Sequence, residues 1–430
     1  MKRTKSVGWL TATAIVVANM IGAGIFTSLG FQLVDTVNSW SIIALWSLGA
    51  LMALCGALSY AELGTYWKRS GGEYHFLSQA FHPVIGYLSG WVSLTVGFAA
   101  PVALATMALG AYVGPYLAVN EMVLALMVII LISGFHSLSL KKSSLLQNTT
   151  TILKLGLILI FLIFGLSMDS SDTAFLWDSS WQGEVFLPAF AVSFVFVTFS
   201  YSGWNAAAYI VDEIKNVKRS LPRALITGTV LVSLLYICLN LVFLKHNGLE
   251  NIQGELEIGQ ITAISLFGNT GGELMSFGIA LLLISSISAM VWAGPRVTQV
   301  MGEDHTLWRW FSVKSSRGIP LRAIWLQASI SIAMVLTGTF EQVIIYSGFI
   351  LQLFSALAVA AVFVIRMRRE DHKGFRSPFY PFPQLVFLIF SLWVLVYLIV
   401  AQPLETGLGL INILIGFLLY QLNKVRFSKK

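Results

Sequence analysis

The feature that most limits how this chain can fold is a series of long apolar stretches that follow one another along almost its whole length. A helix needs about 20 mostly apolar residues to cross a bilayer, and roughly twelve stretches of this sequence meet that need. They lie near residues 8–31, 40–66, 84–115, 121–140, 146–168, 185–211, 223–244, 272–301, 320–338, 341–365, 384–401 and 406–423. Strands of a membrane β-barrel would instead alternate in polarity over about ten residues. The sequence therefore predicts an all-α membrane protein with 12 transmembrane helices.

Composition narrows the class of protein further. Hydrophobic residues make up 57% of the 430 residues and charged residues only 11%, whereas soluble domains carry about 25% charged residues. This composition excludes a soluble enzyme, a secreted disulfide-rich protein and a disordered chain. Cys55 and Cys238 lie within apolar stretches and have no metal-ligand spacing. We therefore expect no cofactor and no bound metal.

The positive charges predict an orientation. Lys and Arg are enriched in the cytoplasmic loops of membrane proteins. With the N-terminus placed inside, 25 of the 27 Lys and Arg residues fall on the same side, which favours both termini in the cytoplasm. The net charge of +7 then reflects topology and anionic lipid, not nucleic-acid binding. The two exceptions are Lys245 at an outer helix end and Lys154 inside the fifth span.

Two spans carry small and polar residues near their middle, where a helix is expected to break. The first contains Gly22-Ala23-Gly24, and the sixth contains Ser202-Gly203. Either stretch alone is typical of close helix packing, but the two lie five spans apart. Glycine-interrupted helices at matching positions in two halves indicate an inverted-repeat transporter. The sequence predicts one domain over 1–424, with repeats at about 8–168 and 185–365 and two further helices at about 384–423.

A pair of broken helices predicts a particular kind of site. The N-terminal end of a half-helix presents free N–H groups, which suit a carboxylate. The C-terminal end of the preceding half-helix presents carbonyl groups, which suit an ammonium group. Glu62 lies at the inner end of the second span and Glu341 at the outer end of the tenth. No carboxylate is therefore expected at the middle of the membrane. These features indicate a site for a zwitterionic α-amino acid.

At these residues the chain resembles the amino acid–polyamine–organocation superfamily, and most closely its L-type amino acid transporter branch. The segment Ile21–Phe26 resembles I-G-S/A-G-I-F of the first helix. Tyr60–Gly64 with Ser70–Tyr74 resembles Y-A-E-L-G…S-G-G-E-Y, and Phe199–Asn205 resembles F-A-Y-x-G-W-N. Asp212–Ala224 resembles the loop motif that follows helix six. The resemblance implies a LeuT-type fold, a 5+5 inverted repeat in which helices 1 and 6 are discontinuous.

The resemblance also implies which residues bind substrate. They are Met20, Ile21, Gly22, Ala23, Gly24, Ile25, Phe199, Ser200, Ser202, Tyr236 and Ser286. The substrate carboxylate would meet N–H groups around Gly22–Gly24, and the ammonium would meet the carbonyls of Met20, Phe199 and Ser202. The aromatic at the position of Phe199 closes the site from outside in related proteins.

Lys154 is the charge to which the resemblance assigns a mechanistic role. The fifth span must begin near Leu146, which places Lys154 about 12 Å deep at 1.5 Å per residue. In sodium-coupled relatives a sodium ion ties helix one to helix eight near this place, and a helix-five lysine replaces it in several sodium-independent relatives. We expect the ammonium to bridge carbonyls near 16–17 with Ser285 or Ser286. Tyr236 is expected to join this network or to meet the carboxylate.

The leading prediction is a sodium-independent exchanger of small to medium neutral L-amino acids, such as Ala, Ser or Thr, in the cell membrane. A proton-coupled symporter, with Lys154 losing its proton during the cycle, remains an alternative. A non-transporting amino-acid sensor is a second alternative. No enzyme is expected, because the six histidines lie in loops or near helix ends. The outer loop 114–121 contains no cysteine, so no disulfide-linked heavy chain is expected.

Overall fold

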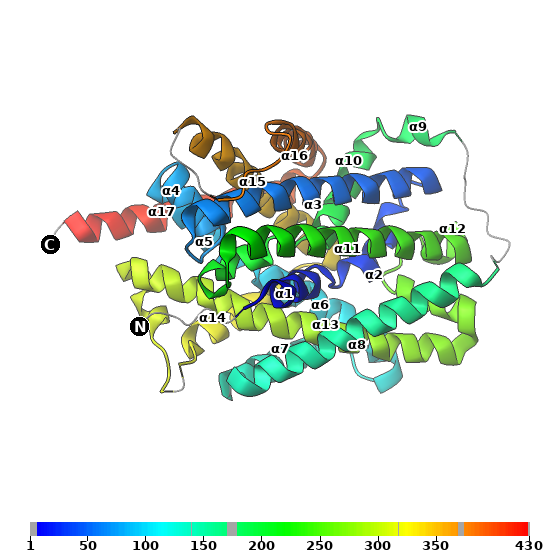
Figure 1. The fold of residues 1–430 in the computed structure, drawn as a ribbon. Helices are drawn as coiled ribbons and strands as arrows, with labels where there is room; N and C mark the ends of the chain where they lie inside the picture. The colour runs from blue at the N-terminus through cyan, green and yellow to red at the C-terminus, as the bar shows by residue number, and fades with distance from the viewer. Residues whose placement is uncertain (1–6, 139, 170–178, 317, 369–373, 429–430) are drawn as a thin grey trace.

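The computed structural model describes residues 7–138, 140–169, 179–316, 318–368 and 374–428. In these ranges the regular backbone structure is helical, apart from isolated bridge residues such as Val7 and Ile214, which form a parallel bridge. Figure 1 shows the helices packed side by side as one bundle, with the start of α1 and the end of α17 at the same end. We call this the terminal end, which also holds α4 and α5, and the opposite one the far end, which holds α9 and α12.

The helices follow one another with short connections. In chain order they are α1 (Trp9–Met20), α2 (Gly24–Gln32), α3 (Ser39–Trp67), α4 (Glu73–Ala80), α5 (Pro83–Val92), the π-helical η1 (Ser93–Gly97), α6 (Ala99–Leu117), α7 (Glu121–Leu138), α8 (Leu140–Ser167), α9 (Trp181–Glu184), α10 (Pro188–Tyr201), the 3-10 helix η2 (Ala206–Glu213), α11 (Val217–His246), α12 (Leu249–Ile252), α13 (Ile258–Asp304), the 3-10 helix η3 (Thr306–Ser312), α14 (Leu321–Thr337), α15 (Phe340–Met367), α16 (Phe382–Ala401) and α17 (Pro403–Ser428). Helix α13 starts well before the predicted 272, and Gly268, with φ of 72°, interrupts its helical geometry.

Nine helical segments within the described ranges are long and apolar enough to cross a membrane. Two further apolar segments, Ile152–Ser167 and Leu321–Thr337, are shorter. The prediction of an all-helical membrane protein with many spans is confirmed at this level. Three predicted spans are not among these nine segments. Leu321–Thr337 has only 17 residues, and α10 ends where the sixth predicted span is interrupted. Ile152–Ser167 is one part of the longer helix α8, Leu140–Ser167.

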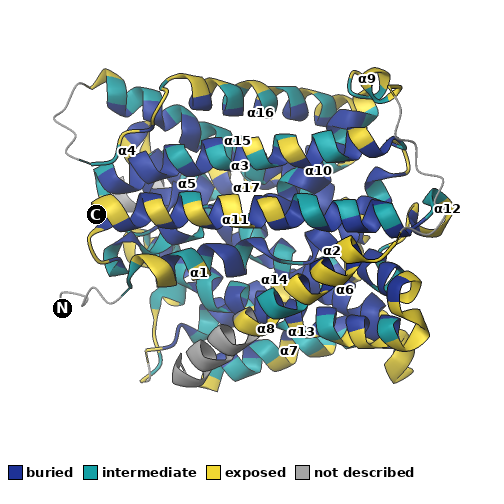
Figure 2. Ribbon diagram, turned by 45° about the vertical axis from the view of Figure 1, so that its right-hand side comes forward, coloured by how far each residue is buried: buried dark blue, intermediate teal, exposed yellow. Residues whose placement is uncertain are grey.

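The helices differ in how deeply they are buried, and this difference locates the centre of the bundle. In the apolar stretch of the α1–α2 segment, 72% of the residues are buried within the protein. The corresponding share is 22% for α7 and 28% for α17. Figure 2 shows exposed residues along the outward sides of peripheral helices such as α16. Apolar side chains such as Leu131, Ile389 and Val400 are at least 64% exposed, as expected for surfaces that face lipid. The broken α1–α2 segment therefore lies inside a ring of other helices.

One buried ion pair connects α3 to α15. Arg366 of α15 places its Nε 2.6 Å from Oε1 of Glu62 in α3, and an Nη atom donates to Oε2 at 2.9 Å. The backbone N–H of Ser377 also donates to Oε2, at 2.7 Å. The Glu62 side chain is fully buried, so its charge depends on these partners.

We predict that Arg366→Met lowers the free energy of unfolding by roughly 3–5 kcal/mol, because it leaves a buried carboxylate without its cation. Denaturation in detergent micelles measures the change. Arg69→Met is the matched control, since Arg69 pairs with Asp304 at 3.6 Å and both side chains are at least 36% exposed. That control should change stability by less than about 1 kcal/mol. Equal losses in the two variants would contradict the prediction.

Candidate functional site

The two interruptions of the helices lie against one another at the centre of the bundle. Helix α1 ends at Met20 and α2 begins at Gly24, while α10 ends at Tyr201 and η2 begins at Ala206. Gly203 has a φ of 98°, and a Cβ placed on it would lie 2.8 Å from the carbonyl group of Asn19. Only glycine combines this left-handed conformation with so close an approach. Gly203, the second residue after α10, is therefore packed directly on the last turn of α1.

Tyr236 of α11 connects the C-terminal ends of the two half-helices. Its Oη lies 2.6 Å from the carbonyl oxygen of Met20 and 3.1 Å from that of Ser200. The last carbonyls of a helix have no partner within that helix, and inside a membrane protein each must find one. Tyr236, which is fully buried, supplies a donor where α1 and α10 both end. The structure thus places Tyr236 at the interruptions themselves, with its hydroxyl group on the carbonyls of both helix ends.

Lys154 of α8 holds the same break from another side. Its Nζ donates to the carbonyl of Ile21 at 2.5 Å, to that of Ala18 at 3.4 Å and to Oγ of Ser286 at 2.8 Å. Ser286 of α13 in turn donates to the Ile21 carbonyl at 3.0 Å. The Lys154 side chain is completely buried. One ammonium group therefore joins α8, the break after α1 and α13.

This network differs in detail from the one expected from the sequence. The carbonyls that accept from Lys154 belong to Ala18 and Ile21, further along the chain than the expected 16–17. The carbonyl of Val17 instead accepts the backbone N–H of Ile21. Of the two serines considered, Ser286 contacts Lys154, and Ser285 is the buried residue before it in α13.

The start of α2 packs closely on α10. A Cβ on Gly24 would lie 2.8 Å from the Cα of Ser200, and the hydroxyl groups of Ser28 and Ser200 lie 3.0 Å apart. Ile25, like Ile21, is completely buried, and Ala23 is 4% exposed. The small residues of the predicted site thus bring two half-helices into contact.

A cavity of about 1050 Å³ adjoins these breaks. Next to the breaks it is lined by Asn19, Phe199, Ser202 and Gly203. From there it extends to Val7, which precedes α1 at the terminal end. Phe199 and Ser202 are therefore the predicted substrate residues that line it. The remaining predicted residues are not part of its lining: Met20, Ile21, Gly22, Ala23, Gly24, Ile25, Ser200, Tyr236 and Ser286. Lys154 and Ser285 also lie outside the lining.

At the far end the same half-helices are closed off by packing. The ring of Phe31 stacks between those of Phe196 and Phe340, with centroid distances of 5.6 and 5.7 Å. The backbone N–H of Gly254 donates to the carbonyl of Gly30 at 2.9 Å. The central breaks can therefore be reached from the terminal end and are shielded from the far end.

Glu73 also lines the cavity, and the sequence reasoning gave it no role. It is 5% exposed, and its Oε1 accepts from Oη of Tyr60 at 2.5 Å and from Nδ2 of Asn205 at 3.1 Å. Burial raises the pKa of the Glu73 carboxyl, and the hydrogen bonds from Tyr60 and Asn205 partly oppose that rise. Glu73 belongs to the motif Ser70–Tyr74, which indicates that it could be functional. Its position in the cavity, however, depends on how α4 packs. Among the described residues, no group of three or more His, Cys, Asp or Glu could hold a metal ion.

Comparison with known proteins adds a second line of evidence. A family model described as amino acid permease matches residues 7–419. The chain is 28% identical to a serine/threonine exchanger of Bacillus subtilis, over 97% of this chain and 96% of the relative. It is 29% identical to the b(0,+)-type amino acid transporter 1 of Homo sapiens, over 97% and 87%. It is 26% identical to the cystine/glutamate transporter of Homo sapiens, over 97% and 85%.

The two glycines of the first break provide a matched test of the packing. Gly24→Ala should lower the free energy of unfolding by about 1–3 kcal/mol, because the added methyl group overlaps Ser200 in a filled interior. A Cβ on Gly22 would meet its nearest heavy atom, the Met20 carbonyl oxygen, only at 4.0 Å, so Gly22→Ala should stay within about 0.5 kcal/mol of the parent. Denaturation of both variants in detergent measures the difference. If Gly22→Ala is the more damaging change, the contact between α2 and α10 is wrongly placed.

Proposed function

Because the chain belongs to the amino acid permease family, we propose that this multi-pass membrane transporter exchanges neutral L-amino acids across the cell membrane without sodium. The observation that carries the proposal is the Lys154 ammonium, which bridges the break after α1 to Ser286 of α13. A bound cation at this place would need the same carbonyl and hydroxyl oxygens. Since a lysine side chain already satisfies them, the exchange needs no sodium ion. We propose no enzymatic activity for the cavity or for the helix breaks.

The proposed architecture is a LeuT-type fold with twelve spans. The nine long apolar segments, the two shorter ones and the pair α10–η2 together supply that number. Spans one to five and six to ten form the two repeats, each beginning with an interrupted helix, and α16 and α17 follow them. The domain extends over 1–424, with Gly22 and Gly203 at equivalent places in the two repeats.

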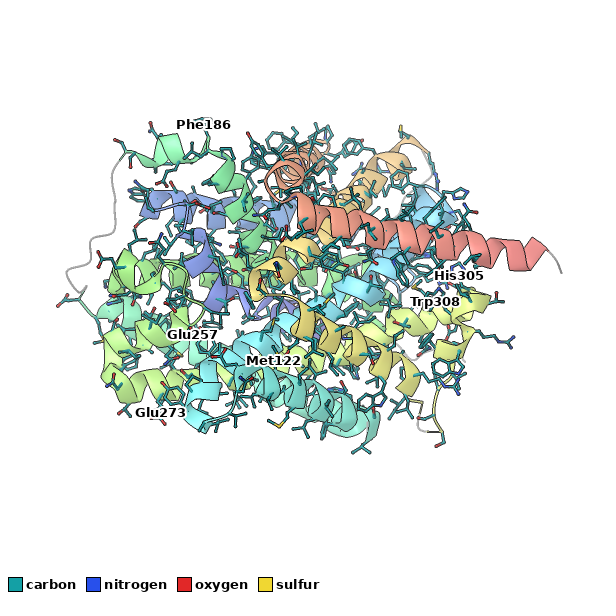
Figure 3. The ribbon with its side chains drawn as sticks, turned by 180° about the vertical axis from the view of Figure 1, so that it is seen from behind. Met122, Phe186, Glu257, Glu273, His305 and Trp308 are labelled. Atoms are coloured by element: carbon teal, nitrogen blue, oxygen red, sulfur yellow. The ribbon has the colours of Figure 1, made fainter. Side chains whose placement is uncertain are left out.

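In the proposed orientation the terminal end is cytoplasmic. Most Lys and Arg residues then lie on the cytoplasmic side, as cytoplasmic loops require. Figure 3 places Glu257 and Glu273 toward one end of the bundle and His305 and Trp308 toward the end where α17 runs out. With this orientation the cavity opens inward, and the aromatic packing around Phe31 closes the outer side. The structure then corresponds to an inward-facing state of an alternating-access cycle.

The proposed substrate position lies between the two breaks. The N–H groups of Gly22, Ala23 and Gly24 at the start of α2 would receive the carboxylate, as helix N-termini do for anions. The ammonium would meet the carbonyls of Met20, Phe199 and Ser202. The Met20 carbonyl already accepts from Tyr236, and that of Phe199 from the N–H of Ser202, but a carbonyl oxygen has a second lone pair. The substrate enters this position from the cavity, past Phe199.

A small neutral substrate is favoured by the residues around the break. Ser202 and Ala206 line the cavity there and leave space for a side chain of small or medium size, such as those of Ala, Ser or Thr. The bacterial relative of 28% identity is a serine/threonine exchanger, which supports the same choice. The proposal includes no covalently attached partner chain, no nucleic acid and no cofactor. Proton-coupled symport and amino-acid sensing without transport are the alternative functions.

A transport experiment separates these functions. Proteoliposomes loaded with unlabelled serine should accumulate labelled serine in sodium-free buffer without a pH gradient, whereas empty vesicles should accumulate little. A competition panel of unlabelled amino acids then ranks the substrates. Strong uptake into empty vesicles that depends on a proton gradient would establish the symporter instead. Serine binding without uptake under any of these conditions would establish the sensor.

Lys154→Ala should reduce exchange by roughly tenfold or more, because hydrogen bonds to a charged group contribute about 1.5–3 kcal/mol each. Serine-induced thermal stabilisation of the purified variant should persist, since Lys154 is not part of the cavity lining. Lys245→Ala is the matched control, because Lys245 is a partly buried lysine away from the helix breaks that donates to the carbonyls of Leu166 and Met168. Unchanged flux in Lys154→Ala would remove the proposed role of this lysine.

A further inference from the structure

We propose that Glu73 is a proton-binding residue of this transporter, and that its protonation state sets how firmly η2 is held against α3 and α4 in the inward-facing state. This inference rests on the proposed transport function. It concerns a residue outside both helix breaks, and a proton site separate from Lys154.

Glu73 lies where four segments meet. It begins α4, and its Oε1 accepts from Tyr60 of α3 at 2.5 Å and from Asn205, just before η2, at 3.1 Å. Ser355 of α15 also hydrogen-bonds its carboxyl group. Asn205 lies two positions after Gly203 in the chain. The hydrogen bond from Asn205 therefore connects the Glu73 carboxyl group to the break of the sixth span. Any change in the Glu73 hydrogen bonds therefore acts directly on the half-helix that adjoins the proposed substrate.

The ring of Trp204 reinforces this link. It packs edge-on against the ring of Tyr60, with centroids 4.7 Å apart. Tyr60 thus contacts both Glu73 and the residue that follows Gly203. The carboxyl group, the phenol and the two residues before η2 form one connected unit at the cavity wall.

In the part of the chain that the structure describes, the groups that face the Glu73 carboxyl are neutral. They are Tyr60 of α3, Asn205 and Tyr209 at η2, and Ser355 of α15. Its neighbour His75 on α4 interacts with Arg69, Asp212 and Asp304 instead, and burial lowers the pKa of His75 to about 4. On α5, Tyr87 bonds to Trp308, and Arg366 of α15 pairs with Glu62. A buried carboxylate without a cation is costly, and protonation removes that cost.

Exposure to the cavity provides the path for the proton. Glu73 lines the cavity that extends to the terminal end, so protons can reach it from the cytoplasm in the proposed orientation. Burial raises the pKa of this carboxyl above its ordinary value, and proton release is therefore favoured in any state in which Glu73 becomes more hydrated. By linkage, a falling cytoplasmic pH favours the state described here, and a rising pH favours release of η2.

The test is the dependence of exchange on internal pH in proteoliposomes. Serine exchange by the parent protein should follow a titration curve with its midpoint above about 4.3, the ordinary value for Glu. Glu73→Gln should show a flat profile at the acid limit of the parent, because glutamine resembles the protonated form. Glu73→Asp should keep a titration, and Tyr60→Phe should move the midpoint upward because the carboxylate loses a donor. Glu341→Gln, the same chemical change at the start of α15, should keep the parent profile.

A Glu73→Gln variant that keeps the pH profile of the parent would overturn the inference. If that variant also loses competition by lysine or arginine, Glu73 is instead a subsite for a cationic side chain. Potentiometric titration of the purified protein separates this inference from the transport proposal. The parent should bind one proton more than Glu73→Gln as the pH falls, even if neither protein exchanges serine, and equal proton binding would refute the assignment.

Discussion

The structure depends on the need to satisfy backbone carbonyl groups where helices stop inside an apolar environment. An unbroken helix bonds nearly all its own polar groups, but α1 and α10 end near the centre of the bundle and leave carbonyls without helical partners. Tyr236 and Lys154 supply the missing donors from α11 and α8. The breaks are possible because these two side chains are present, and the small residues at Gly24 and Gly203 allow the half-helices to meet.

These donors come from helices far away in the sequence. The contact of Lys154 with Ile21 spans 133 residues, and that of Ser286 with the same carbonyl spans 265. The carbonyl of Ile21, in the break after α1, therefore connects α1 to both α8 and α13. A substrate that enters between the breaks would meet groups whose positions are already coupled to α8, α11 and α13. With the proposed substrate position, binding would therefore act on the contacts that hold these helices together.

The sequence predicted the parts of this architecture that depend on composition along one helix. The apolar stretches predicted the spans, Gly22 and Gly203 marked the interruptions, and the depth of Lys154 singled it out. It could not predict which carbonyls Lys154 would reach, because each residue turns a helix by about 100° and a small change in helix rotation selects another acceptor. For the same reason the position of Glu73 could not be deduced. Its burial follows from how the short α4 packs on its neighbours, and no periodicity in eight residues reveals that.

The hydroxyl group of Tyr236 has one hydrogen atom but lies within bonding distance of two carbonyl oxygens, those of Met20 and Ser200. At any instant it can donate to only one of them. The two helix ends therefore share a single O–H donor. A rotation of this hydroxyl by a fraction of a turn would change which carbonyl it binds without moving the phenol ring. The last turns of α1 and α10 are thus both tied to one oxygen atom of α11.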